Sequence, residues 1–186
     1  MPTPTLRALF IDHIRDLYDA EKQLTKALPK LAKAADSEEL SNAISEHLEQ
    51  TRDHVSRLEK VFATVDTPAK GKSCKAMKGL VEEGSEAITE YKGEGPLSDL
   101  AMIAAAQKVE HYEVSAYGTA RTMAEQLGNA EAARLLQETE KEERKADETL
   151  TKIALSLYES VGGDGKLQMG AAYETSGTRD GKQASR

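Results

Sequence analysis

Residues 103–124 read IAAAQKVEHYEVSAYGTARTMA, and this stretch has the pattern of a buried helix face that two acids interrupt. Small or apolar side chains recur at steps of three and four residues, the spacing of one face of an α-helix. Glu110 and Glu113 occupy successive positions of that face, between Ala106 and Tyr117. The stretch therefore predicts a core helix that carries two carboxylates inward.

Three other long segments carry apolar stripes with the same period, and few helix breakers interrupt them. No glycine precedes Gly71, and no proline lies between Pro29 and Pro68. Pro29 is expected to kink the first helix near its end rather than to abolish it. Asp36 or Ser37 and Asn129 are expected as caps. We expect long helices over about 5–31, 37–64, 98–127 and 129–160.

A shorter segment over 74–91 has a thin apolar face and lies between loops that contain glycine and proline. We expect it to cross the long helices as a connection. The sequence thus predicts an all-α fold, a ferritin-like four-helix bundle with a short extra helix in the crossover between the second and third long helices. Its two helical hairpins would span 5–65 and 98–160. Residues 161–186 are expected to form a flexible polar tail outside the 1–160 bundle.

Composition excludes several classes of protein. The chain has 186 residues, with 25 Lys and Arg against 32 Asp and Glu, and a net charge of −7. We expect no nucleic-acid partner, because a binder needs a basic face, and no membrane span, because the apolar runs are short. Cys74 is the only cysteine, so neither an internal disulfide nor a thiolate cage is available. The absence of a leader pattern at Met1 favours the cytoplasm.

Carboxylates also interrupt the stripes of the first and fourth long helices. Glu21 fills the gap between Leu17 and Leu24, and Glu143 lies between Leu136 and Leu150. The second helix offers His47 and Thr51 at the same level, and Asp147 follows Glu143 by one turn. In a bundle of alternating helix directions, these positions fall in one layer. The predicted ligands are Glu21, His47, Glu110, Glu113, Glu143 and Asp147.

A buried acid must be protonated, paired or bound to a cation. Nearby basic residues such as Lys108 and Arg144 sit beside the stripes in sequence and should face outward. Two ions of iron or manganese would neutralise about four negative charges, and both metals accept carboxylate and imidazole ligands. The sequence therefore predicts a di-metal carboxylate site in the bundle core.

Each residue has an ordinary alternative. A single glutamate on an apolar stripe is often a surface residue whose helical phase is slightly misjudged. Glu143 lies in an acid-rich run with Glu140 and Glu142, which is typical of a solvated face. His47 alone fits a core or boundary histidine. His13, His54 and His111 are expected at the boundary of the core.

Four segments together resemble the YciE/YciF family of bacterial ferritin-like proteins. They are residues 17–24, 46–51 and 104–113, together with Glu142, Glu143 and Asp147, and Gln107-Lys108-Val109-Glu110-His111-Tyr112-Glu113 is the most specific run. The resemblance spans about residues 5–160. It implies a ferritin-like bundle with a di-metal centre, a homodimer, and a role in stress response in the bacterial cytoplasm.

The chain departs from the general di-iron pattern. None of its histidines has a glutamate three residues before it, and Gln50 stands where the family often carries glutamate. This change could weaken one metal position, leave it to water, or shift ligation to Glu49 or His54.

Two functions stay open from the sequence. The first is redox chemistry on O₂, peroxide or the metal, with Glu110 or Glu113 and Glu143 as bridging or chelating ligands and Glu21, His47 and Asp147 as terminal ones. Tyr18 or Tyr117 would relay electrons in that function, although both also fit core aromatics. The second is a non-enzymatic stress or interaction protein, a dimer with a vestigial metal site. An iron-storage cage is less favoured, because no mineral-nucleating surface is evident.

Overall fold

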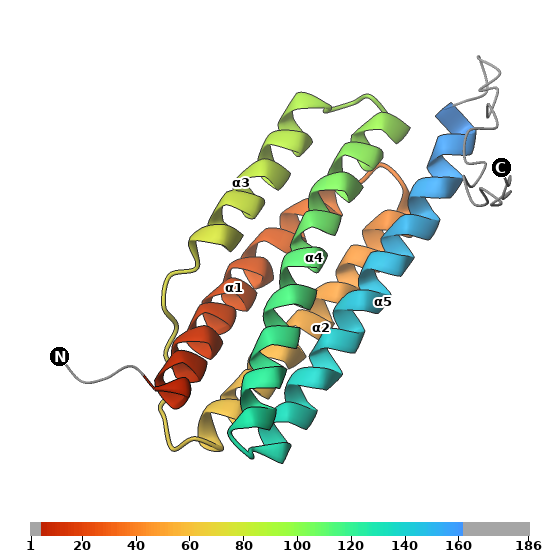
Figure 1. Cartoon of the computed structure of the whole chain (residues 1–186). Helices are drawn as coiled ribbons and strands as arrows, with labels where there is room; N and C mark the ends of the chain where they lie inside the picture. The colour runs from red at the N-terminus through yellow and green to blue at the C-terminus, as the bar shows by residue number, and fades with distance from the viewer. Residues whose placement is uncertain (1–4, 162–186) are drawn as a thin grey trace, which may run out of the picture.

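The computed structural model describes residues 5–161, and this part of the chain forms five helices (Figure 1). Four are long and one is short, so the predicted all-α class is confirmed. The helices are α1 Leu6–Ala34, α2 Glu38–Ala63, α3 Lys75–Glu90, α4 Pro96–Gln126 and α5 Ala130–Val161.

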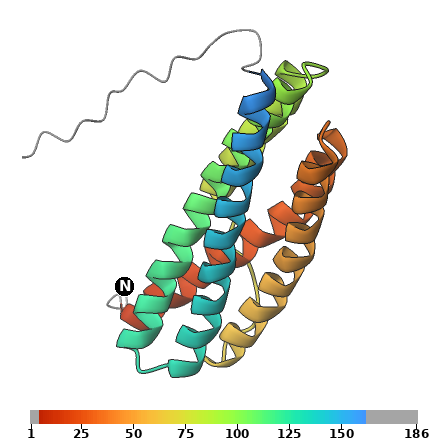
Figure 2. The same cartoon turned by 90° about the vertical axis from the view of Figure 1, so that its right-hand side faces the viewer.

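The long helices form two antiparallel hairpins, α1 with α2 and α4 with α5, which pack together into a bundle (Figure 1). The short α3 lies in the crossover between the hairpins and packs against α1 and α4. This is the predicted ferritin-like arrangement. Figure 2 shows that the hairpins lie close together at one end and diverge at the end where α1 turns into α2.

Side-chain caps fix where several helices begin. Ser37 accepts a hydrogen bond from the Leu40 amide, and Asn129 accepts one from the Ala132 amide, as expected. Helix α4 begins at Pro96 rather than at the expected Ser98, because proline suits the first helical turn. Pro29 lies inside α1, which continues to Ala34.

The core consists of two apolar halves with a polar layer between them. One half contains Phe10, Leu58, Tyr117 and Leu136, and the other contains Leu24, Ile44, Met102 and Leu150. On every long helix, at least one buried polar residue lies near the level where the two halves meet, whereas Ser98 and Asp99 are buried separately in the first turn of α4. The fold thus surrounds a polar layer with apolar packing above and below.

The predicted tail lies outside the described residues, apart from Val161 at the end of α5. The boundary at residue 160 therefore stays a prediction. Among the described helices, none combines the length and the apolar character that a membrane span requires.

Candidate metal centre

The polar layer gathers six metal-ligating side chains from the four long helices. Five are predicted ligands, and the sixth is His54. All six are buried, and four of them are fully so. They are Glu21, His47, His54, Glu110, Glu113 and Glu143.

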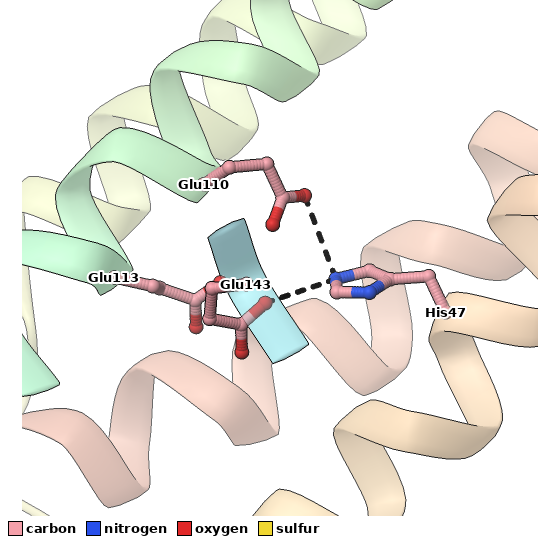
Figure 3. Close-up of side chains that lie close together, drawn as sticks. All are labelled: His47, Glu110, Glu113 and Glu143. Atoms are coloured by element: carbon pink, nitrogen blue, oxygen red, sulfur yellow. Dashed lines mark ion pairs between the residues drawn. The ribbon is translucent and has the colours of Figure 1, made fainter. Parts of the chain in front are cut away.

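The first group consists of His47, Glu110, Glu113 and Glu143 (Figure 3). Each residue offers one ligand atom, and these atoms lie within 4.8 Å of one another. The His47 Nε2 atom lies 3.5 Å from Glu110 Oε1 and 3.7 Å from Glu143 Oε2. Three carboxylates and one imidazole therefore point toward a common space.

The second group consists of Glu21, His54 and Glu143, again with ligand atoms within 4.8 Å of one another. The His54 Nδ1 atom lies 2.9 Å from Glu143 Oε1 and 3.5 Å from Glu21 Oε1. Glu143 thus belongs to both groups, with Oε1 toward His54 and Oε2 toward His47. This is the position of a carboxylate that can bridge two ions.

Outer residues hold the ligands of the second group in place. The His54 Nε2 atom is 2.8 Å from Glu142 Oε2, and Arg57 holds the same oxygen at 2.7 Å. The Tyr117 hydroxyl donates a hydrogen bond to Glu21 Oε1. A carboxylate on one ring nitrogen orients a histidine so that its other nitrogen faces a metal, which is a common arrangement in metal sites.

Many polar atoms of the layer have no hydrogen-bond partner among the described residues, although they are fully buried. Such atoms normally cost free energy. They include Glu21 Oε2, Glu110 Oε2, both carboxylate oxygens of Glu113, and Nε2 of His47. Because these orphaned atoms converge on the same two spaces, the residues fit a bound cation in each.

Burial and the neighbouring charged groups shift the pKa values of several side chains in the polar layer. Burial, followed by the neighbouring carboxylates, raises the pKa of Glu110 and Glu113 well above the ordinary value. Burial alone would lower the pKa of His54, but hydrogen bonds to Glu142, Glu143 and Glu21 raise it to about 12. A cation that binds here therefore competes with protons.

The donor set also narrows the class of metal. It combines carboxylate oxygens with imidazole nitrogens, and this combination suits transition metals better than calcium or magnesium. Cys74 is buried elsewhere, with its sulfur 3.1 Å from the Tyr112 hydroxyl. Oxygen and nitrogen donors thus make up both groups.

Asp147 is the one predicted ligand that joins neither group. Its carboxylate accepts a hydrogen bond from Gln107 Nε2 at 2.9 Å and lies 3.4 Å from His111 Nε2. Because four residues correspond to slightly more than one helical turn, Asp147 is rotated away from Glu143 toward the partly exposed side of α5.

His54 was not among the six predicted ligands, and the sequence named it only as a residue to which ligation could shift because of Gln50. His54 is fully buried, so its expected boundary position was wrong, whereas His13 is half-buried and His111 is exposed. Seven residues separate His47 from His54, and a heptad keeps both on nearly the same face. That spacing was the available signal. At 1.5 Å per residue, the two histidines lie about 10 Å apart along the helix. They are therefore too far apart to bind the same ion, but each can bind a different one. Glu49 is exposed and pairs with Arg52.

Comparisons with known proteins extend these observations. Residues 5–160 match the family described as a domain of unknown function, DUF892. The chain is 46% identical over 157 residues to the protein YciF of Escherichia coli strain K12, a match that covers 84% of this chain and 94% of that protein.

Two solved structures are similar over most of their length. The crystal structure of the E. coli stress protein YciF has a TM-score of 0.81 at 46% identity, covering 84% of this chain and 99% of that one. YcfI from Rhodopseudomonas palustris has a TM-score of 0.77 at 38% identity, and the match covers 80% of this chain and 94% of that one.

Proposed function

The chain belongs to the DUF892 family, as its resemblance to YciE and YciF predicted, and from this premise we propose that its bundle core holds a di-metal carboxylate centre. The observation that carries the proposal is Glu143, whose two oxygens face two separate groups of buried ligands. Two ions of iron or manganese are the proposed occupants.

Each ligand has a proposed role. His47, Glu110 and Glu113 would hold one ion, Glu21 and His54 would hold the other, and Glu143 would contribute one oxygen to each. Four carboxylates carry four negative charges, which two divalent cations balance. Asp147 is left out of this set, and Glu142 acts through His54 by fixing its ring.

When bound, iron or manganese would supply one-electron redox chemistry toward O₂ or peroxide. The chain's own contribution is a buried site, enclosed by apolar packing on both sides, with anionic ligands already oriented. Because the similar protein YciF is named a stress protein, we extend the proposal to a stress-related role. A cytoplasmic location and a homodimer belong to the same proposal.

One observation favours the alternative, a non-enzymatic stress or interaction protein with a vestigial site. The second group has only three protein ligands, and Thr51 beside it uses its hydroxyl to bond the His47 carbonyl at 2.9 Å. His54 can itself carry a positive charge opposite Glu21 and Glu143. In this alternative, the protonated imidazole takes the place of one metal ion.

Metal stoichiometry distinguishes the two functions. Protein purified without chelators should take up two equivalents of Fe²⁺ or Mn²⁺ per chain, measured by elemental analysis and calorimetry. Glu143→Gln keeps the side-chain volume but removes the shared charge, so it should weaken both sites by at least tenfold. Glu148→Gln is the matched control, because Glu148 is an exposed acid on the same helix.

Two equivalents bound as tightly by Glu143→Gln as by the unchanged chain would refute the bridging role. Substoichiometric metal in the unchanged chain, with no effect of metal on its melting temperature, would favour the non-enzymatic alternative.

A further inference from the structure

An apolar cavity of about 260 Å³ lies between α1, α3 and α4, next to the first ligand group. Its walls are mainly aliphatic. They include Leu24, Leu28, Leu80, Val81, Ile88 and Val109. A smaller cavity of about 100 Å³ lies between the two hairpins and shares Leu28, Leu31, His47, Ala106 and Glu110 with the larger one. The two cavities therefore meet at His47 and Glu110.

The cavity exists because α3 covers this end of the bundle incompletely. The two hairpins diverge here (Figure 2), and Met77 is the one buried residue of α3. Gly84 lies on the cavity wall, and a Cβ atom added to it would meet no other atom within 4 Å. A side chain at this position would fill space that the protein leaves open.

The two ends of the cavity differ in chemistry. At the inner end, His47 and Glu110 are more than nine-tenths buried, and both His47 ring nitrogens and Glu110 Oε2 lack hydrogen-bond partners among the described residues. At the outer end, Lys26 and Lys30 are exposed and form no ion pair with residues 5–161. An apolar wall thus separates a positive rim from a polar floor.

We propose that this cavity binds a short aliphatic carboxylate. Its hydrocarbon chain lies against the leucine and valine walls, its carboxylate pairs with Lys26 and Lys30, and the far end of the chain reaches His47 and Glu110. Apolar walls with a few polar groups are typical of small-molecule sites. An engineered apolar cavity of about 150 Å³ holds benzene, so this cavity holds a somewhat larger molecule.

This inference adds a ligand class to the proposed metal centre. It rests on that proposed function only for any reaction at His47 and Glu110, which are proposed metal ligands at the inner end of the cavity. Binding of the carboxylate does not depend on the metal, because the walls and the rim contain no proposed metal ligand. Binding should therefore be measurable on the metal-free chain. Metal uptake and carboxylate binding are separate readouts, and either can fail alone.

Calorimetric titration with butanoate, hexanoate and octanoate tests the orientation of the chain. Each buried methylene should tighten binding by about fourfold. Equal affinities for the three acids would overturn the proposal, because they would indicate surface ion pairing alone. Affinity that appears only with Fe²⁺ or Mn²⁺ bound would also overturn it, because the carboxylate would then be a metal ligand.

Gly84→Leu places a side chain in the cavity and should weaken octanoate binding by at least tenfold. Gly79→Leu is the matched control on the same helix, because its added Cβ also meets nothing within 4 Å but Gly79 does not line the cavity. Equal octanoate affinity in the two variants would place the ligand elsewhere. Both melting temperatures should stay close to that of the unchanged chain.

A second variant tests the rim without changing the cavity. Lys26→Gln with Lys30→Gln should weaken octanoate binding several-fold and leave binding of the uncharged octanol unchanged. If octanoate and octanol binding weaken to the same extent, or if neither weakens, the assigned position of the carboxylate would be contradicted.

Discussion

At the scale of single residues, the site depends on how each carboxylate oxygen is directed. Glu143 contributes one oxygen to each ligand group, whereas the neighbouring Glu142 turns outward to hold His54 and Arg57. Adjacent glutamates on one helix thus have different roles, because successive residues point about 100° apart around the axis.

The Glu142 contacts make a pH-dependent contribution to stability. The hydrogen bond from His54, together with Arg57, lowers the pKa of Glu142 from 4.5 to about 2. Its stabilising contribution is therefore complete above about 4.5 and is lost as the pH falls toward 2. Glu142→Gln should lower the free energy of unfolding of the metal-free chain at neutral pH by roughly 1–2 kcal/mol, because partial exposure screens the charges.

Urea unfolding at several pH values measures this difference, with Glu148→Gln as the control. The difference in the free energy of unfolding between the unchanged chain and Glu142→Gln should shrink as the pH falls from about 4.5 toward 2. A difference that is constant with pH would assign the effect to packing rather than to charge.

At the scale of helices, polar contacts at the ends fix how the hairpins dock. Asp99, in the first turn of α4, is fully buried and accepts hydrogen bonds from the Asp36 and Ser37 amides, both at 2.8 Å. These amides lie at the start of α2. One side chain thus ties the turn between α1 and α2 to the beginning of α4, at the end where the hairpins diverge.

Asp99→Ala should lower the free energy of unfolding by about 1–3 kcal/mol, because the Asp36 and Ser37 amides lose their buried acceptor. Glu38→Ala is a suitable control, since Glu38 is exposed in the first turn of α2. Chemical denaturation of both variants measures the effect. Equal stabilities would show that water replaces the Asp99 carboxylate.

At the scale of the whole molecule, the polar layer joins all four long helices at one level. Because a bound metal is held by the folded chain and not by the unfolded one, metal binding should stabilise the entire bundle. The apolar halves on either side keep the layer enclosed. Metal and fold are therefore expected to depend on each other.

Metal at 100 times its Kd should stabilise the chain by about 2.7 kcal/mol, which raises Tm by roughly 5–10 °C. Glu110 and Glu113 have raised pKa values and bind protons that the metal must displace, so the increase should grow as the pH rises. Differential scanning calorimetry with and without a chelator measures it. The same Tm increase in Glu143→Gln would contradict binding at this layer.

The sequence alone was enough to predict the helices and the acids that interrupt their apolar faces, because helical periodicity is a local property. Glu110 and Glu113 stand out for this reason, and the resemblance to YciE and YciF supports the same layer. Five of the six predicted ligands lie together in the structure.

Only the tertiary structure decided which side chains converge. It excluded Asp147 from the two groups, placed His54 opposite Glu21, and left a cavity beside Gly84. Periodicity gives the face of each helix, but not the rotation and divergence of the helices relative to one another. Those depend on packing between residues far apart in the chain, and they determine where the ligands meet.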